Sequence, residues 1–228
     1  MPTYDQLKRQ VDLASRRKIG GRSVLDTVKR RAQDSPIPGA FSFAVAILSQ
    51  EGRIADPAAF QNGWRSTNGP EKSPWQVHPR WHDFAKDTPA TDFAAYTNYA
   101  MGLLEDGWYE TGTLYGAARR YNSFNACSDN REDACRNGRR YAQSVIDRLP
   151  QIQRALKAAG YQIGPDVSSR PDVVGGGGGG GALESGLSGS LGGLIAAVVL
   201  GGGTLYYVST QDEPAPRPSS QVQAQTSA

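Results

Sequence analysis

Apolar residues recur along roughly the first 160 positions at the three- and four-residue spacing that is typical of amphipathic helices. Residues 4–33 carry two such stripes, which the Gly20-Gly21 pair separates. Further stripes predict helices over about 90–107, 110–121, 138–149 and 151–159, with a break at Pro150. Almost no segment alternates with a period of two, so we expect a mostly α-helical domain without a substantial sheet.

The most apolar of these predicted helices runs from Phe41 to Glu51. Its apolar positions cover enough of the surface to predict a buried helix, and Glu51 lies at the carboxyl end of its apolar face. Residues 52–80 follow, with seven Gly and Pro residues that predict a long irregular loop. Loops of this length inside a compact domain are commonly functional.

The character of the chain changes near residue 164. Residues 164–186 include seven consecutive glycines and predict a flexible linker. Residues 187–208 carry no charge and are long enough for a transmembrane helix, although a Gly-rich disordered stretch or a buried helical hairpin are alternatives. Residues 209–228 are rich in Pro, Ser and Gln and predict a disordered tail. The remaining divisions are a basic helical segment over 1–34 and the main domain over 35–163.

Charge is distributed unevenly between these parts. Residues 1–165 contain 23 Lys and Arg against 17 Asp and Glu, whereas residues 166–228 contain 2 against 5. A basic domain suits an anionic polymer such as the cell wall, teichoic acid or nucleic acid, but ordinary solvated helix faces explain the charge equally well. We therefore predict no specific nucleic acid as a partner. The amino terminus has no apolar run, so we expect no secretory signal peptide.

Glu51 is the candidate for acid–base chemistry. A carboxyl group among apolar side chains has its charged form disfavoured, so it can hold a proton near neutral pH and protonate a glycosidic oxygen. Position alone is a weak signal, because a Glu at a helix end is more often a solvated surface residue.

Four segments change this weighting, because their order and spacing resemble the lytic transglycosylases and goose-type lysozymes. Residues 46–51 (AILSQE) resemble the family's helix that ends in the catalytic Glu, and residues 73–79 (SPWQVHP) its Gly-Leu-Met-Gln-Val-x-Pro groove segment. Residues 114–122 (LYGAARRYN) are similar to its Ala-Leu-Ala-Ala-Tyr-Asn segment, and residues 141–145 (YAQSV) to its Tyr-x-x-x-Val segment. The sequence departs from the family at Gly52, where Ser is usual, and in the Ser-Pro-Trp of residues 73–75.

The resemblance implies a lysozyme-like fold and a peptidoglycan lytic transglycosylase that works without a cofactor. Glu51 would be the single acid and base that cleaves the bond between N-acetylmuramic acid (MurNAc) and N-acetylglucosamine (GlcNAc). Gln76 would bind substrate, Tyr121 would lie near Glu51, and Asn122 would hold the Tyr-Asn turn. The flat rings of the tryptophans are expected to contact sugar, unless they pack in the core; these are Trp64, Trp75 and Trp81.

Other functions remain open from the sequence. A hydrolytic muramidase would need a second carboxylate, for which Asp56, Asp83, Asp87 and Asp92 are candidates by position. A glucosaminidase would cut the other glycosidic bond, and a non-catalytic glycan-binding membrane protein would use the fold without chemistry.

Two further residue pairs could bind a metal ion or form a disulfide bond. His78 and His82 have the spacing of metal ligands on a helix, but no third ligand is evident, so we expect no metal site. Cys127 and Cys135 flank a polar loop, where a disulfide and two free thiols are both reasonable.

The architecture as a whole resembles an enzyme tethered to a membrane by one carboxyl-terminal span. We expect it in the internal membrane of a bacteriophage virion, where it would open the wall during genome entry, or in a bacterial inner membrane with the enzyme facing the wall. Its partners would then be peptidoglycan glycan strands, the membrane and other virion or envelope proteins.

Overall fold

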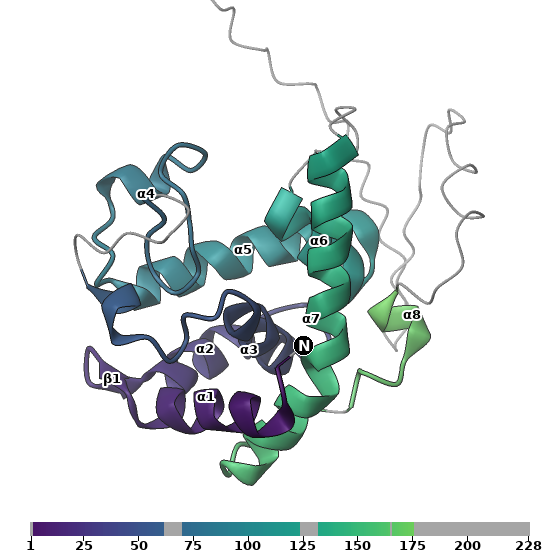
Figure 1. Ribbon diagram of the computed structural model, residues 1–228, viewed down its shortest axis with the longest axis horizontal. Helices are drawn as coiled ribbons and strands as arrows, with labels where there is room; N and C mark the ends of the chain where they lie inside the picture. The colour runs from purple at the N-terminus through teal and green to yellow at the C-terminus, as the bar shows by residue number, and fades with distance from the viewer. Residues whose placement is uncertain (1, 62–69, 124–131, 165, 176–228) are drawn as a thin grey trace, which may run out of the picture. The chain divides into compact units, whose positions relative to one another are not determined.

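The computed structural model describes residues 2–61, 70–123, 132–164 and 166–175, and this part of the chain is mostly helical, as predicted (Figure 1). Its only paired strands are two residues each, β1 (Lys18–Ile19) and β2 (Arg22–Ser23), joined across the Gly20-Gly21 turn. The helices are α1 (Tyr4–Arg16), α2 (Val24–Ala32), α3 (Ala40–Gln50), the 3-10 helix η1 (Pro57–Phe60), α4 (Phe84–Asp87), α5 (Phe93–Thr111), α6 (Leu114–Ser123), α7 (Glu132–Ala158) and α8 (Pro171–Val174).

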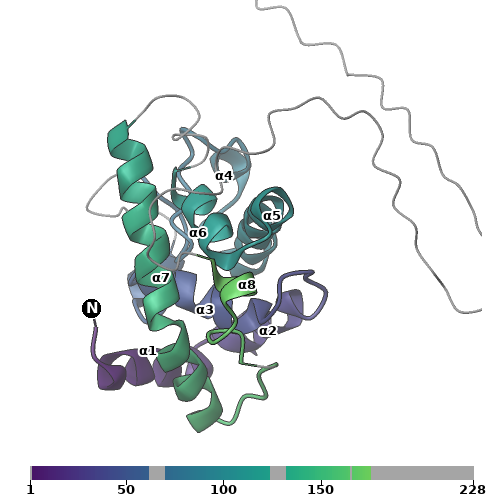
Figure 2. The same ribbon diagram turned by 90° about the vertical axis from the view of Figure 1, so that its right-hand side faces the viewer.

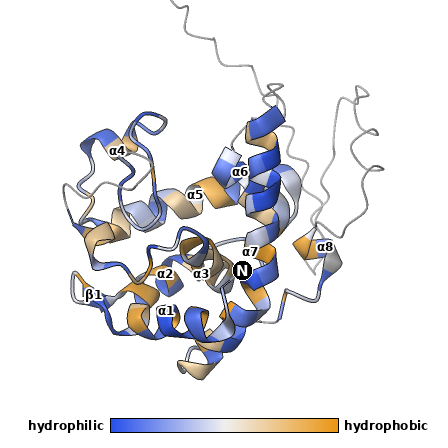
Figure 3. Cartoon of the chain, viewed as in Figure 1, coloured by the Kyte–Doolittle hydropathy of each residue, from blue (hydrophilic) through white to orange (hydrophobic). Residues whose placement is uncertain are grey.

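The two amino-terminal helices belong to the same hydrophobic core as the rest of the described chain. Thr3 and Gln6 form a reciprocal capping box at the start of α1, and the Ser23 hydroxyl accepts from the Asp26 N–H at the start of α2. Their apolar faces are buried in the core, while hydrophilic residues occupy the other face of α1 (Figure 3). All described residues belong to one compact unit, so residues 1–34 are structurally continuous with 35–163.

Helix α3 occupies the interior of this unit, where it packs on α2 and α7. Helices α1 and α5 lie on opposite sides of it (Figure 1). Every residue from Ala40 to Ser49 is buried, which confirms the buried helix that the apolar run predicts. The helix begins after Gly39, whose φ of 65° favours glycine, and an added Cβ there would approach a Val167 methyl to 2.8 Å. The first turn of α3 is therefore packed closely against Val167.

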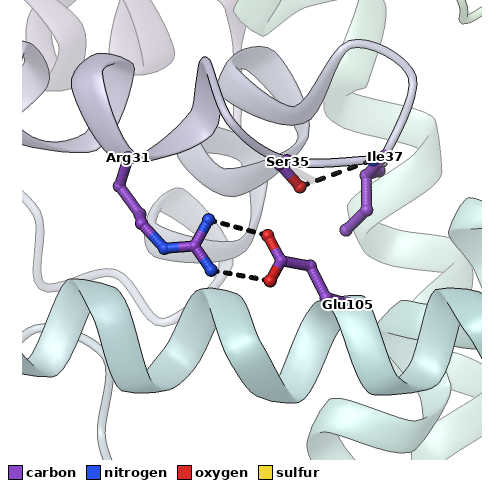
Figure 4. A network of polar contacts seen from close by, with 4 residues as sticks. All are labelled: Arg31, Ser35, Ile37 and Glu105. Carbon is purple, nitrogen blue, oxygen red and sulfur yellow. Dashed lines mark hydrogen bonds and ion pairs between the residues drawn. The ribbon is translucent and has the colours of Figure 1, made fainter.

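An ion pair joins α2 to α5. The guanidinium of Arg31 donates to both carboxylate oxygens of Glu105, at 2.8 and 2.6 Å (Figure 4). Both side chains are only partly exposed, and such two-point pairing is among the stronger ionic contacts in proteins. This contact fixes the amino-terminal helices to the long helix that follows the irregular loop.

The prediction of a helix break at Pro150 is wrong, because α7 continues from Glu132 to Ala158 through that residue (Figure 2). A proline inside a helix removes one backbone hydrogen bond and crowds the preceding turn. Pro150 is exposed, so water can satisfy the freed carbonyl, while Leu149 and Ile152 on either side are buried and hold the helix to the core. Burial on both sides therefore overrides the local signal.

The expected transmembrane helix over 187–208 lies outside the described residues, as do the tail over 209–228 and residues 176–186 of the expected linker. Residues 166–175 of that linker are described, and they pack on the domain: Val167 and Val173 are buried in its core, and α8 contacts α6. Among the described helices, none is both long and apolar enough to cross a bilayer.

Candidate active site

Glu51 is the residue at which α3 ends, and its backbone N–H still donates to Ile47. Gly52 follows with a φ of 70°, which turns the chain away from the helix axis into the irregular loop. The carboxyl group is thus held at the end of a rigid, buried helix. Burial raises its pKa to about 7, and the negative charge of Glu71 contributes in the same direction.

The Tyr141 hydroxyl, from α7, donates to Oε1 of Glu51 at 2.6 Å. This bond and the charge of Arg148 both lower the pKa of Glu51, but burial outweighs them. Burial and the neighbouring Glu51 carboxylate raise the pKa of Tyr141 well above its usual value, so the phenol remains a proton donor to the carboxylate. Arg148, on the same helix as Tyr141, donates from Nε to the Ser144 carbonyl at 3.1 Å.

The segment that resembles the groove motif folds back against Glu51. Lys72 and Val77 form an isolated antiparallel bridge. Between them, Ser73 and Gln76 both have positive φ angles, of 66° and 52°. Non-glycine residues with positive φ are uncommon and collect at functional sites. Here the Gln76 side-chain amide donates to the backbone carbonyl of Glu51 at 3.0 Å, which ties the tight turn to the end of α3.

Trp75 and Tyr121 connect this turn to helices α5 and α6. The indole N–H of Trp75 donates to the Thr97 hydroxyl of α5 at 3.1 Å, and the side chain is only 1 % exposed. Tyr121, on α6, donates its hydroxyl to the Trp75 carbonyl at 2.7 Å. The two aromatic rings also meet edge to face. Trp75 therefore anchors the turn, and its buried ring does not offer an open face.

These residues line one cavity of about 320 Å³, which is at the lower end of the range for ligand sites. It brings together five of the predicted site residues: Glu51, Trp75, Gln76, Tyr121 and Asn122. Trp81, which was also expected to contact sugar, lines the cavity as well. The other lining residues were not among the predicted substrate contacts: Glu71, Val77, His78, His82 and Leu103. Trp64, the remaining predicted residue, lies outside the described part of the chain.

Sequence reasoning missed two polar residues of this site. Tyr141 belongs to the Tyr-x-x-x-Val resemblance, but no contact with Glu51 was expected of it. Tyr121 lies near Glu51, as expected, in the same cavity, while its hydroxyl bonds the Trp75 carbonyl. Glu71, five positions before Gln76, is the carboxylate that shares the cavity with Glu51. Its position in the irregular loop beside the groove motif was the available signal.

The four candidate second carboxylates do not line this cavity. Two of them cap helices: Asp56 accepts from the Ala58 N–H, and Asp92 from the Ala95 N–H. Asp83 pairs with Lys86 on the surface. The contacts of Asp56, Asp83 and Asp92 are therefore local.

The histidine and cysteine pairs are also accounted for. Nδ1 of His82 lies 2.9 Å from the Tyr99 hydroxyl, and burial lowers the pKa of His82. Within the described ranges, His, Cys, Asp and Glu side chains form no group of three that could hold a metal ion. Cys135 is disulfide-bonded; Cys127, the only other cysteine of the sequence, lies outside the described residues.

Comparison of this chain with models of protein families, with curated proteins and with solved structures finds no significant match. The geometry and chemistry of this cavity are therefore the guide to its function.

Proposed function

We propose that this protein is a peptidoglycan lytic transglycosylase with a lysozyme-like fold, and that Glu51 is its single general acid and base. One observation carries the proposal: a carboxyl group with a pKa of about 7 faces a cavity beside the Gln76 turn. At pH 7 roughly half of such groups hold a proton, so the same residue can donate a proton and accept one.

The reaction would proceed in two steps at Glu51. The protonated carboxyl gives its proton to the glycosidic oxygen between MurNAc and GlcNAc, and the bond from C1 of MurNAc to that oxygen breaks. The resulting carboxylate then takes the proton from the 6-hydroxyl of the same MurNAc, whose oxygen bonds to C1. The products are a 1,6-anhydro end and a free 4-hydroxyl; no water is consumed, and Glu51 returns to its protonated form.

The neighbours of Glu51 would support both steps. Tyr141 donates to the carboxylate that exists between them, so the charged form is stabilised without losing the high pKa that burial produces. Gln76 and Asn122 line the cavity and can hydrogen-bond sugar hydroxyl and acetamido groups. General acid–base action of this kind contributes about 10²–10⁴-fold in rate.

A hydrolytic muramidase is the second candidate, and Glu71 favours it. Two carboxylates on opposite sides of a glycosidic bond allow one to act as acid while the other activates water. Glu71 lines the cavity and its charge acts on Glu51. The identity of the new chain end separates the two reactions.

The setting proposed for this activity is a membrane. Residues 187–208 would anchor the enzyme on the linker of residues 164–186, in a phage internal membrane or a bacterial inner membrane. The partners would be the glycan strands of the wall and neighbouring virion or envelope proteins.

Digestion of purified peptidoglycan by the full-length protein, followed by mass spectrometry, tests the proposal. Anhydro-MurNAc ends support the transglycosylase, whereas reducing MurNAc ends identify the muramidase and reducing GlcNAc ends a glucosaminidase. The Glu51→Gln variant should release no fragments. If the wild type releases none either, a non-catalytic glycan-binding protein replaces the enzyme.

A further inference from the structure

Trp81 lies at the cavity but is not part of the core. Its side chain lines the same space as Glu51 and Gln76, yet 67 % of the residue is exposed. Trp75, six positions earlier, is buried and hydrogen-bonded. An isolated exposed apolar residue is ordinary on a protein surface, but an exposed indole that also borders a polar cavity offers a ligand-binding face.

The chain around Trp81 is held in place. The backbone N–H groups of Trp81 and His82 both donate to the carbonyl of His78, at 3.0 and 3.1 Å, which forms a tight turn. The His82 ring contacts Tyr99 of α5, with Nδ1 2.9 Å from its hydroxyl, and Tyr99 stacks on Phe84. The turn is thereby fixed to the long helix, and the indole has a defined position relative to Glu51.

A neighbouring cation lies over the exposed ring. The guanidinium carbon of Arg80 is 4.7 Å from the centre of the Trp81 indole, and the Arg80 backbone N–H donates to Nδ1 of His78. The His78 imidazole also contacts the indole, with 6.5 Å between ring centroids and 53° between the ring planes, so two neighbours restrain the ring. Because the residue remains 67 % exposed, a flat ligand can reach the rest of the indole.

We propose that Trp81 is a stacking platform for a sugar ring of the glycan strand, close to the glycosidic bond whose oxygen Glu51 protonates. The assignment rests on the proposed function, which makes the occupant an N-acetylhexosamine unit. Such a ring presents one face of C–H groups that packs on an aromatic surface, while its hydroxyl and acetamido groups point to water. A cavity of about 320 Å³ is small for a polymer, so the strand must continue over its mouth, where Trp81 lies.

Binding of a GlcNAc hexamer to the full-length Glu51→Gln variant, measured by calorimetry, isolates the platform from cleavage. Adding Trp81→Ala should weaken this binding about tenfold, the effect expected when a sugar ring covers roughly 50 Å² of apolar surface. Trp81→Phe retains a flat ring and should keep affinity within about threefold, whereas Trp81→Leu, apolar but not flat, should behave as the alanine variant. Tyr109→Ala is the matched control, because Tyr109 is 73 % exposed and does not line the cavity.

The outcomes separate the platform from the enzyme. In the active protein, Trp81→Ala should raise the peptidoglycan concentration needed for half-maximal rate and leave the maximal rate nearly unchanged. Affinity lost in Trp81→Ala while the wild type cleaves nothing would support the platform and overturn the enzyme. Equal affinity in Trp81→Ala and Tyr109→Ala, or no hexamer binding by Glu51→Gln itself, would overturn the platform even if the wild type cleaves peptidoglycan.

Discussion

Replacing Glu51 with glutamine should stabilise the fold at alkaline pH while abolishing cleavage. The pKa of Glu51 rises from 4.5 to about 7 on folding, chiefly through burial. The folded state therefore binds more protons than the unfolded state between these pH values. The stability that the proton contributes is fully present below pH 4.5 and is lost as the pH rises through 7.

The magnitude follows from the shift. One pKa unit corresponds to about 1.36 kcal/mol, so holding the Glu51 carboxylate in the folded protein at pH 8 costs about 3 kcal/mol relative to pH 4. A glutamine has the same shape, can accept the same bond from Tyr141, and never ionises. The Glu51→Gln variant should thus be about 3 kcal/mol more stable than the wild type at pH 8, and nearly equal to it at pH 4.

Urea unfolding followed by circular dichroism at the two pH values measures this difference. Asp106→Asn serves as the control, since Asp106 is an exposed carboxyl on the same domain and its replacement should not produce a comparable gain at pH 8. If Glu51→Gln changes the free energy of unfolding equally at pH 4 and pH 8, the carboxyl is not held in its neutral form, and the proposed acid–base role loses its physical basis.

Three further predictions test the surroundings of the carboxyl group. Tyr141→Phe removes the bond that favours the charged form of Glu51, so the pH at which activity declines on the alkaline side should move upward in a pH–rate profile. Glu71→Gln removes a negative charge that raises the pKa of Glu51, so the alkaline decline of activity should move to lower pH. An unchanged pH for this decline would show that the charge of Glu71 does not act on Glu51. Gly107→Ala should destabilise the fold by about 1–3 kcal/mol in urea unfolding, because its Cβ would lie 2.9 Å from the Cα of Ala117 where α5 crosses α6.

Local pattern was sufficient for most helices. The apolar run before Glu51 predicts a buried helix because no face of it is polar enough to meet water, and α3 is buried from Ala40 to Ser49. The position of Glu51 at the end of that helix follows directly. The prediction of a helix break at Pro150 was wrong because proline disfavours a helix only locally, whereas burial of Leu149 and Ile152 in the core holds the helix together across it.

The contacts of Glu51 could not be predicted in the same way. Tyr141 is separated from Glu51 by 90 positions, and no periodicity indicates which of two tyrosines from different helices reaches a given carboxylate. Glu71 lies in an irregular loop, where side-chain direction depends on turns such as the positive φ of Gln76. Spacing indicated which segments meet, whereas tertiary packing decided which atoms bond.

The conflicts with local preference in this domain meet at one place. A carboxyl group ends the most apolar helix, Gln76 adopts a backbone conformation that disfavours side chains, and Trp81 leaves an indole in water. The buried carboxyl and the positive φ each lower stability, and the exposed indole contributes no burial of its own. Their convergence on one cavity makes sense if the carboxyl must keep a proton at neutral pH, the turn must hold its position, and the indole receives a ligand. The cost at Glu51 is then the physical source of its acidity near pH 7, and a variant that relieves that cost removes the proton donor with it.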